Sequence, residues 1–377
     1  MRVLFVITEL ILGGAETLLV NLVNSLGARP EFDITVVCLD THNPLAEKLH
    51  PDVCDLVVFP RRWRYDLHYP AWRIADVIRA KRIEAILCFG LYEYMFVKLA
   101  LRYCREHAHV YVSLHETLPR SLKDDLQKFL YFRLLGREEI LVAICRSQVA
   151  YLSKRYRIAP ERFMVIYGGV DCNHFSPHLF AAQRQQIRQE LGIEENAQAL
   201  IQVAGFRKEK AHENSIIALK GLVDQCPHLD PYLLFVGSGD NERVNSLMAL
   251  TRTCGVAGRV IFAGAQRDVR PFLSASDIHT LSSVAIESFS QSSLEAMAMG
   301  LPCVITDLAG AREMIVPWQN GLLVKPGNVP ELSIAWKSAL SYTWDSHAIR
   351  HSVISNFEYS KTVEGYAELL SGLRMLA

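Results

Sequence analysis

The stretch ESFSQSSLEAMAMGLPCVIT (287–306) contains a loop, a helix and a strand in immediate succession. Ser292 and Glu295 fit the S-x-x-E capping box that opens a helix, and Gly300 is placed to end it. The apolar run at 302–306 then has the length and composition of a buried strand. This order predicts one repeat of a parallel α/β sheet.

Similar apolar runs alternate with helical patterns along most of the chain. In the first half they are at 3–8, 34–39, 56–59, 85–89, 109–114, 140–144 and 164–167. In the second half they are at 199–204, 232–237, 259–264, 278–283 and 302–306. Continuous apolar strands separated by helices indicate parallel sheets covered on both faces. The fold class we predict is therefore α/β, with two doubly wound Rossmann-like domains.

The two series of strands are separated by a polar stretch that contains no apolar run. At 377 residues the chain is long enough for two domains. We predict a first domain at 1–175 and a second at 176–357, the latter including a linker at 176–198. The tail at about 358–377 is expected to form a helix that packs back on the first domain.

The composition is that of an ordinary folded protein with no global charge. Forty basic residues balance forty acidic ones, which gives no sign of a nucleic-acid partner. The nine cysteines are scattered without a C-x-x-C, so reduced thiols are expected instead of disulfides. No signal peptide and no spanning apolar run is evident, and these features together predict a cytoplasmic protein.

Glu287 and Glu295 are two carboxylates eight residues apart, spanning a strand end, a loop and a helix start. The end of a parallel strand and the start of the next helix meet at one crevice, where free N–H groups favour a phosphate. Carboxylates beside such a site can accept hydrogen bonds from sugar hydroxyls. The alternative for Glu295 is that it does no more than cap its helix.

Segment 287–313 resembles the E-x7-E signature of glycosyltransferase family 4, which contains retaining enzymes with the GT-B fold. The resemblance is collinear over nearly the whole chain. Its other segments are LGGAE (12–16), YVSLHET (111–117), YGGVDCNHF (167–175), VAGFRKEKAHE (203–213), FVGSGD (235–240) and FAGAQRDV (262–269). The resemblance implies two Rossmann-like domains that face each other across a cleft, with acceptor bound by the first and nucleotide sugar by the second.

The resemblance also implies roles for individual residues. Those expected near the chemistry are His115, Arg207, Lys210 and Glu287. Those expected to bind the nucleotide sugar are Gly13, Gly14, Gly237, Gln266, Arg267, Phe289, Ser290, Gln291, Ser292 and Glu295. No metal site is expected, because no His or carboxylate cluster has ligand spacing and no D-x-D occurs. No cofactor is expected besides the donor itself.

Several of these residues also have an ordinary structural interpretation. The basic cluster of Arg207, Lys208 and Lys210 could be a solvated loop, although it could equally neutralise a leaving diphosphate. The family more often has Arg two positions before Arg207, where this chain has Gly205. Gly13 and Gly14 could form a simple strand-to-helix turn, and His115 could be a structural histidine.

The function predicted on these grounds is retaining, metal-independent transfer of a hexosyl group from a nucleotide-diphosphate sugar. UDP-glucose is a representative donor, and the acceptor is a glycan, a lipid-linked or a small molecule, as in polysaccharide biosynthesis. One alternative is a nucleotide-sugar 2-epimerase of the same fold, and another is a non-catalytic sugar-nucleotide-binding subunit. The basic, aromatic stretch at 60–73 could make peripheral contact with the inner face of a membrane, or could be a solvated loop.

Overall fold

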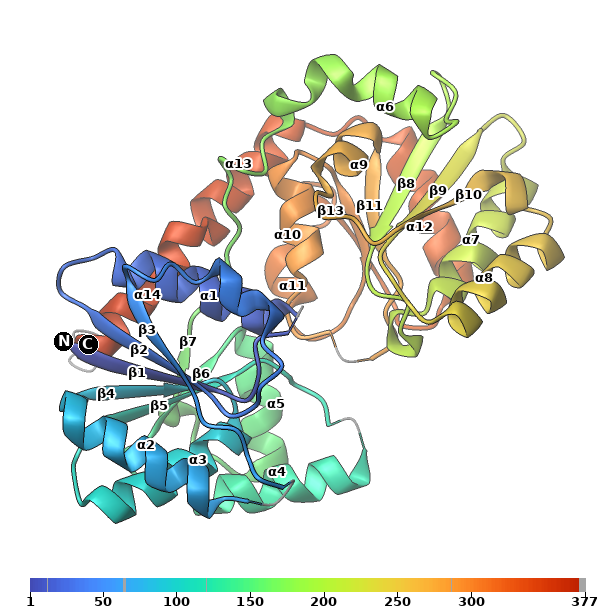
Figure 1. The fold of residues 1–377 in the computed structure, drawn as a ribbon. Coiled ribbons are helices and arrows are strands. Elements are labelled where there is room, and N and C mark those ends of the chain that lie inside the picture. Colours follow the sequence, from blue (N-terminus) through green and yellow to red (C-terminus); the bar gives the residue numbers. More distant parts are fainter. Residues whose placement is uncertain (12, 64–65, 120, 286, 373–377) are drawn as a thin grey trace. The chain divides into compact units, whose positions relative to one another are not determined.

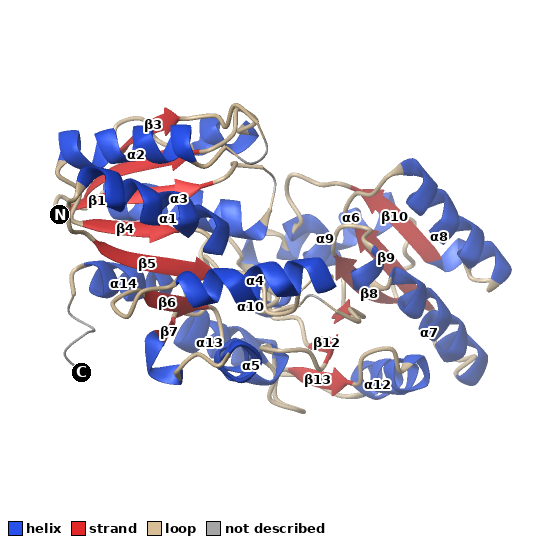
Figure 2. Ribbon diagram, turned by 90° about the horizontal axis from the view of Figure 1, so that it is seen from below, coloured by secondary structure: helices blue, strands red, loops and turns tan. Residues whose placement is uncertain are grey.

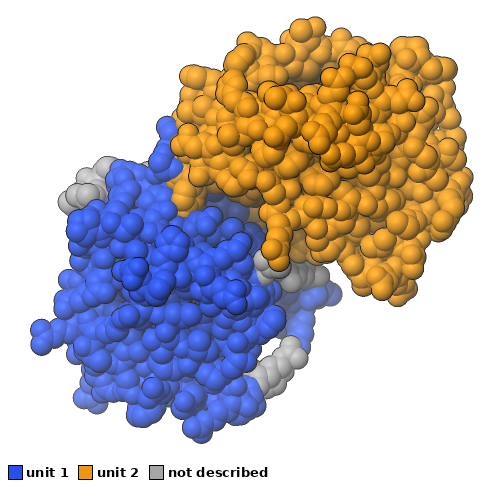
Figure 3. Space-filling model, turned by 45° about the horizontal axis from the view of Figure 1, so that its top comes forward, with its two compact units in different colours: residues 1–168, 360–377 blue, residues 169–359 orange. Residues whose placement is uncertain are grey.

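The computed structural model describes residues 1–11, 13–63, 66–119, 121–285 and 287–372. The chain divides into two compact units, which Figure 3 shows in different colours. Unit 1 consists of Met1–Gly168 together with the C-terminal segment that begins at Ser360, and unit 2 of Gly169–Tyr359. No described helix is long and apolar enough to cross a membrane.

Unit 1 is built on a seven-stranded sheet in which every pair of neighbours is parallel (Figures 1 and 2). The strands are β1 (Arg2–Ile7), β2 (Asp33–Cys38), β3 (Cys54–Val58), β4 (Ala85–Cys88), β5 (His109–Leu114), β6 (Ile140–Ala143) and β7 (Phe163–Val165). Their spatial order is β3-β2-β1-β4-β5-β6-β7. The sheet was predicted from seven apolar runs, and each run overlaps one of these strands, with ends that differ by at most two residues.

Helices connect the strands of unit 1. They are α1 (Gly14–Gly27), α2 (His68–Lys81), α3 (Leu91–Cys104), α4 (Leu122–Leu134) and α5 (Arg146–Tyr156). The C-terminal helix α14 (Tyr359–Leu370) joins them, and its buried Tyr366 lies with its hydroxyl oxygen 3.0 Å from Ser113 Oγ on β5. Thr362 Oγ1 also donates to the carbonyl of Tyr167.

The boundary between the units lies after Gly168, seven residues before the predicted end of the first domain at 175. Residues 169–175 belong to unit 2 because their backbone is bonded there. Val170 pairs with Glu358 in an isolated bridge. The guanidinium of Arg350 donates to the carbonyls of Cys172 and Phe175 at 2.5 and 2.6 Å.

Unit 2 is built on a six-stranded parallel sheet in the order β10-β9-β8-β11-β12-β13. The strands are β8 (Gln198–Val203), β9 (Pro231–Val236), β10 (Val260–Gly264), β11 (Ile278–Leu281), β12 (Cys303–Thr306) and β13 (Gly321–Val324). The helices are α6 (Arg184–Glu190), α7 (His212–Gln225), α8 (Asn241–Thr253), α9 (Arg270–Ala275), α10 (Gln291–Ala298), α11 (Ala311–Met314), α12 (Val329–Ser341) and α13 (Ser346–Phe357).

Each sheet has one point at which the strand order reverses. In unit 1 it lies between β1 and β4, and in unit 2 between β8 and β11. At such a point the loops that follow the two strands diverge, so a crevice opens at the carboxyl edge of the sheet. The loops after β1, β4, β8 and β11 are therefore the places where this fold presents ligand-binding groups.

Unit 2 buries two histidines in its interior. His279 on β11 and His212 at the start of α7 are both fully shielded from solvent. Burial lowers the pKa of His212 to about 4 and that of His279 to about 3, so both rings are neutral in the folded protein near pH 7.

These histidines should make unit 2 sensitive to acid. The unfolded chain binds their protons below about pH 6.5 while the folded chain does not, so each should lower the free energy of unfolding by ~1.4 kcal/mol per pH unit below that point. Urea unfolding at pH 7.5, 6 and 5 measures the slope. His279→Gln should make the slope shallower, whereas substitution of the exposed His347 by Gln should not. If the free energy of unfolding of His279→Gln depends on pH as steeply as that of the wild type, His279 is not the buried, neutral histidine described here.

Candidate functional site

The loop after β8 (204–211, the β8 loop) is fixed by its neighbours on the sheet edge. Phe206 is buried in the core of unit 2, and its backbone N–H donates to the carbonyl of Ser238 at 2.8 Å. A β-carbon on Gly237 would collide with the carbonyl oxygen of Ala204. Gly237, which we expected to bind the nucleotide sugar, is thus needed for the close approach of two backbones.

Lys210, at the end of this loop, is ion-paired with Glu287 from the loop after β11 (282–290, the β11 loop). Lys210 Nζ lies 2.5 Å from Glu287 Oε2, and the two side chains are only 12% and 14% exposed. Ser283 Oγ donates to the same carboxylate oxygen at 3.1 Å. Lys210 was predicted to contact the phosphate and Glu287 the sugar. The structure joins them in one ion pair at the strand-order reversal of unit 2.

The backbones of the two loops are also bonded to each other. The N–H of Val284 donates to the carbonyl of Glu209 at 2.8 Å, and Ser282 Oγ donates to the carbonyl of Ala211 at 2.8 Å. The side-chain amide of the buried Gln202, on β8, donates to the carbonyl of Lys210 at 3.1 Å. The position of the Lys210–Glu287 pair is thus set by the protein before any ligand binds.

Arg207 is held differently from Lys210. Its side chain is 61% exposed, and its Nε lies 3.2 Å from Glu209 Oε1. An exposed pair of this kind contributes little to stability and leaves the guanidinium able to move. Of the two cations predicted at this loop, Lys210 is the one that the fold places in position.

Helix α10 does not begin as the sequence pattern suggested. Its N-cap is Ser290, whose Oγ accepts a hydrogen bond from the N–H of Ser293 at 3.2 Å. The predicted capping box of Ser292 with Glu295 is therefore wrong, because the helix begins at Gln291 and Glu295 is its fifth residue. Helix capping therefore does not explain why a glutamate stands at position 295.

The carboxyl group of Glu295 makes no hydrogen bond or ion pair with any residue that the structure describes. Burial raises its pKa to about 7. A carboxylate that has no partner among the described residues gains hydrogen bonds when a hydroxylated ligand arrives, which is the chemistry expected at a ribose or sugar contact.

The neighbours of Glu295 in the sequence serve the local structure. The ring of Phe289 packs against that of Phe357 with centroids 5.5 Å apart, and Gln291 Nε2 donates to the carbonyl of Gly169 at 3.0 Å. Ser292 Oγ lies 3.3 Å from Ser290 Oγ. These side chains shape the β11 loop, and their predicted contacts with the ligand remain predictions.

Gln266 and Arg267 are exposed on the loop that follows β10. Gln266 Nε2 donates to the carbonyl of Ala263 at 2.5 Å. The loop leaves the same carboxyl edge of the unit 2 sheet as the β8 and β11 loops. Both residues thus lie on the predicted edge, without a described contact to Lys210 or Glu287.

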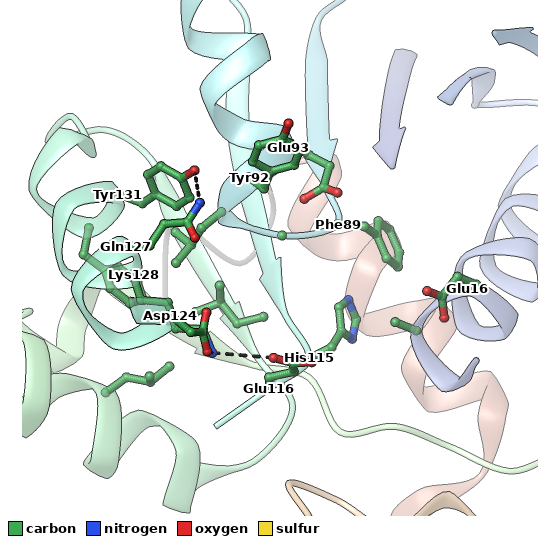
Figure 4. Close-up of a pocket in the computed structure, with 16 residues that line it drawn as sticks. Glu16, Phe89, Tyr92, Glu93, His115, Glu116, Asp124, Gln127, Lys128 and Tyr131 are labelled. Atoms are coloured by element: carbon green, nitrogen blue, oxygen red, sulfur yellow. Dashed lines mark hydrogen bonds and ion pairs between the residues drawn. The ribbon is translucent and has the colours of Figure 1, made fainter. Parts of the chain in front are cut away.

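Unit 1 has a pocket of about 440 Å³ at the carboxyl ends of β4 and β5, bounded on its far side by α4 (Figure 4). His115 follows β5 and stacks on Phe89, with ring centroids 5.1 Å apart. Its Nε2 atom is buried without a hydrogen-bond partner, and burial lowers the pKa of the ring to about 4. His115 is therefore a neutral imidazole on the pocket wall.

Four of the sixteen residues that line the pocket are acidic, and most of the others are apolar or aromatic. Lys128 on α4 lies 3.1 Å from Asp124 and 3.5 Å from Glu116, measured between ammonium nitrogen and carboxylate oxygen. Glu93, at the start of α3, accepts hydrogen bonds from the backbone N–H and the hydroxyl of Thr8, and burial raises its pKa.

None of these acidic residues was predicted from the sequence. Glu93 could have been found from the segment AILCFGLYE (85–93), in which a strand is followed by a glycine and a helix start. This pattern places Glu93 at the same sheet edge as His115.

The glycine pair at the start of α1 belongs to the same region of unit 1. Gly13 is the N-cap of the helix and Gly14 its first residue. A β-carbon on Gly13 would collide with the carboxylate of Glu16, which lines the pocket. The glycine thus allows an acidic side chain to fold back over the helix N-terminus, which favours negative charge.

The described residues contain no group of three or more His, Cys, Asp or Glu side chains that could hold a metal ion. None of the nine cysteines, all of them among the described residues, forms a disulfide, and seven are buried.

Two family models match the chain, one for each half. The model described as Glycosyltransferase Family 4 matches residues 12–174, and that described as Glycosyl transferases group 1 matches residues 183–353. Together they leave only the segment between them and the two ends unmatched.

Among curated proteins, the chain is 26% identical to N-acetyl-alpha-D-glucosaminyl L-malate synthase of Bacillus anthracis, over 70% of this chain and 67% of that protein. It is 28% identical to lipopolysaccharide glucosyltransferase WaaG of Escherichia coli, over 63% of each chain. With mannosylfructose-phosphate synthase of Agrobacterium fabrum the identity is 25%, over 63% of this chain and 54% of that protein. The matched region thus spans between about half and two thirds of these relatives.

Solved structures share the fold. A glycosyltransferase from Rickettsia africae superposes with a TM-score of 0.87 at 19% identity, covering 98% of both chains. Anabaena HepE, in a complex with UDP, superposes with a TM-score of 0.86 at 21% identity, covering 99% of this chain and 100% of that one. These likenesses bear out the predicted GT-B fold of two parallel-sheet domains. The two family models, which match residues 12–174 and 183–353, show that the chain belongs to glycosyltransferase family 4.

Proposed function

We propose that the protein transfers a sugar from a nucleoside diphosphate donor, bound by unit 2, to an acceptor bound by unit 1. The observation that carries the proposal is the buried Lys210–Glu287 pair at the strand-order reversal of unit 2, where doubly wound sheets bind their ligands. The complexes of HepE with UDP and with UDP-glucose make a uridine donor the first to test.

In this proposal Lys210 stabilises the leaving diphosphate. A preorganised cation in a shielded site acts strongly on charge that develops in the transition state, because no reorganisation is needed when the bond breaks. Glu287 holds the ammonium in place before the donor arrives, and then accepts hydrogen bonds from hydroxyls of the transferred ring. The exposed Arg207 can turn toward the diphosphate as a second cation.

We further propose that the anomeric configuration is retained by transfer on the face that the diphosphate leaves. The diphosphate itself accepts the acceptor's proton, so no enzyme nucleophile is required. His115, a neutral imidazole in the unit 1 pocket, can then hydrogen-bond to a hydroxyl without adding charge.

Lys210→Ala should reduce turnover by about two orders of magnitude or more, since one such electrostatic group is worth roughly 2.7–4 kcal/mol in the transition state. The rate of nucleotide release measures this, and a near-normal rate would contradict the role of Lys210.

Glu287→Gln should reduce turnover of the intact nucleotide sugar while affinity for free UDP stays equal or rises, because Lys210 loses its competing carboxylate. Nucleotide release and UDP calorimetry measure the two quantities. Equal weakening of UDP and UDP-sugar in Glu287→Gln would show that Glu287 only supports the loop.

Glu295 should make UDP affinity dependent on pH around neutrality. Its pKa of about 7 means that the carboxylate, the form that accepts hydroxyl hydrogen bonds, is lost as the pH falls from 8 to 6, and affinity should fall with it. Calorimetry with wild type and Glu295→Gln at both pH values tests this, because the titration of UDP itself is common to the two proteins. The variant should bind more weakly at pH 8 and lose less affinity at pH 6. If UDP affinity falls equally in both proteins between pH 8 and pH 6, Glu295 does not contact the nucleotide.

The proposed chemistry needs no metal ion, since Lys210 and helix N-termini supply the positive charge. Transfer should therefore continue after treatment with EDTA. Loss of transfer in the chelator, restored by Mg²⁺ or Mn²⁺, would contradict this part of the mechanism.

We also propose peripheral membrane contact through unit 1. The stretch at 60–73 presents Trp63 and Trp72, which are 61% and 51% exposed. A second pocket of about 470 Å³ joins this stretch to α4, since Arg61 and Leu67 line it together with Lys123, Leu126 and Leu130. The two segments thus form one surface.

On that surface α4 exposes five apolar side chains along one face: Leu122, Leu126, Phe129, Leu130 and Leu134. Lys123 and Arg133 are exposed beside them, whereas Asp125 is turned inward and accepts a hydrogen bond from Tyr156 at 2.8 Å. An apolar stripe flanked by cations suits an anionic bilayer.

The protein should therefore float with vesicles containing phosphatidylglycerol and not with phosphatidylcholine vesicles. Leu126→Glu/Leu130→Glu should abolish flotation. The matched control is Leu179→Glu/Ile334→Glu, which changes two unit 2 side chains of similar exposure (53% and 56%) and should float normally. Equal flotation of both double variants would contradict the assignment of the surface.

A further inference from the structure

Unit 2 carries a cluster of three aromatic side chains on its surface. Trp318 lies just before β13, and Tyr342 and Trp344 follow the end of α12. The ring centroids are 5.3 Å apart for Trp318 and Tyr342, 6.4 Å for Trp318 and Trp344, and 4.7 Å for Tyr342 and Trp344. Trp318 and Tyr342 are nevertheless 48% and 45% exposed. The three rings thus fix one another while two of them stay open to solvent.

The aromatic cluster and the proposed donor site lie at opposite edges of the unit 2 sheet. Trp318 comes before β13, which begins at Gly321, so it lies at the amino edge. The β8 and β11 loops, which hold Lys210 and Glu287, leave the carboxyl edge of the same parallel sheet. A ligand at the cluster therefore does not compete with a nucleotide at the donor site.

Trp318 has a backbone conformation that a tryptophan rarely adopts. Its φ of 65° lies in the left-handed region, which glycine tolerates and a bulky side chain does not favour. Its N–H donates to the carbonyl of Gly321 at 3.0 Å. The buried Asn320 fixes the same turn by accepting from the N–H of Val316 at 2.8 Å and donating to the carbonyl of Met314 at 2.9 Å. Backbone strain that is fixed in this way is typical of ligand-binding positions.

The cluster borders a pocket that has polar groups in its lining. The pocket has a volume of about 330 Å³, and Trp344 lines it together with Arg184, Asp277 and Ser346. Arg184 donates to Asp277 Oδ1 at 2.5 Å, and the two side chains are 35% and 34% exposed. Both groups have hydrogen-bonding capacity beyond this one contact, so they can also bond to the hydroxyls of a ligand.

Aromatic faces next to hydrogen-bonding groups complement a pyranose sugar. A pyranose has C–H groups on its faces, which pack on aromatic rings, and hydroxyls around its rim, which need polar partners. Because the three rings are already packed together, little side-chain freedom is lost when a sugar binds. The residues that separate or follow them in the chain, Gln319, Thr343 and Asp345, are exposed and polar. A patch of this size suits a sugar better than a protein, whose interface typically takes in ~20–30 residues.

We propose that the aromatic cluster is a second binding site of unit 2, and that it takes an uncharged oligosaccharide of pyranose units. The site goes beyond the proposed function, because it lies at the edge of the sheet opposite the donor site. In a protein that extends a glycan, it keeps the chain bound between successive transfers. This use of the site rests on the proposed function, whereas the binding itself does not.

Titration with maltoheptaose and with cellohexaose, followed by saturation-transfer difference NMR, tests the second site. At least one of them should bind to the wild type, with saturation transferred to C–H protons of the sugar rings. Trp318→Gly should weaken this binding at least about tenfold. The variant should keep its fold, as thermal unfolding can check, because glycine is favoured in this backbone conformation. Tyr342→Ala should weaken binding in the same direction.

The matched control is Trp72→Ala, which removes an equally exposed tryptophan (51%) from α2 in unit 1 and should leave oligosaccharide binding unchanged. UDP affinity should be the same in all four proteins. Binding of neither oligosaccharide at millimolar concentration, or equal binding by the wild type and Trp318→Gly, would overturn the second site. So would a wild-type dimer that Trp318→Gly dissociates, because a second copy would then cover the rings. A wild type that binds the oligosaccharide but not UDP would support the second site and overturn the proposed function.

Discussion

The ion pair between Lys210 and Glu287 is the interaction on which the account of unit 2 depends. Both side chains are almost removed from solvent, so each charge is costly without the other. Removing one partner leaves an uncompensated charge at the junction of the two loops. In the proposed function a diphosphate and a hydroxylated ring replace both partners at once, so the pair that is stable in the free protein can be exchanged for the donor.

The scaffold that fixes this pair is the parallel sheet itself. β8 and β11 are neighbours, so the loops that leave their carboxyl ends meet although Lys210 and Glu287 are 77 residues apart in the chain. Gln202, Ser282 and Val284 then tie the loop backbones together. In unit 1 the carboxyl ends of β4 and β5 likewise bring residues from separate segments together, among them Glu93 and the neutral His115.

Much of the fold could be predicted because buried parallel strands are continuous apolar runs. Twelve runs were predicted and each overlaps a strand, but β13 (Gly321–Val324), which directly follows WQN in the sequence, was missed. The helix start at α10 was misplaced because three serines compete for the N-cap, and the pattern cannot tell which one the tertiary contacts select. The resemblance to glycosyltransferase family 4 singled out Lys210, Glu287 and His115, and each of them lies in a loop that follows the carboxyl end of a strand.

What could not be predicted is how these side chains are paired. Nothing in the spacing shows that Lys210 meets Glu287, that Arg207 turns to Glu209, or that Glu295 has no partner among the described residues. The acidic lining of the unit 1 pocket was missed because its members come from α1, α3, α4 and the loop after β5, which only the fold brings together.

The most direct test of the central claim is hydrogen–deuterium exchange of the free protein and of the protein saturated with UDP. If the strand-order reversal of unit 2 holds the nucleotide, peptides covering 204–213 and 287–298 should exchange more slowly in the complex. Those covering α8 and α12 of the same unit should not change. Unchanged exchange in both loops with UDP bound, or protection confined to another edge of the sheet, would contradict the account.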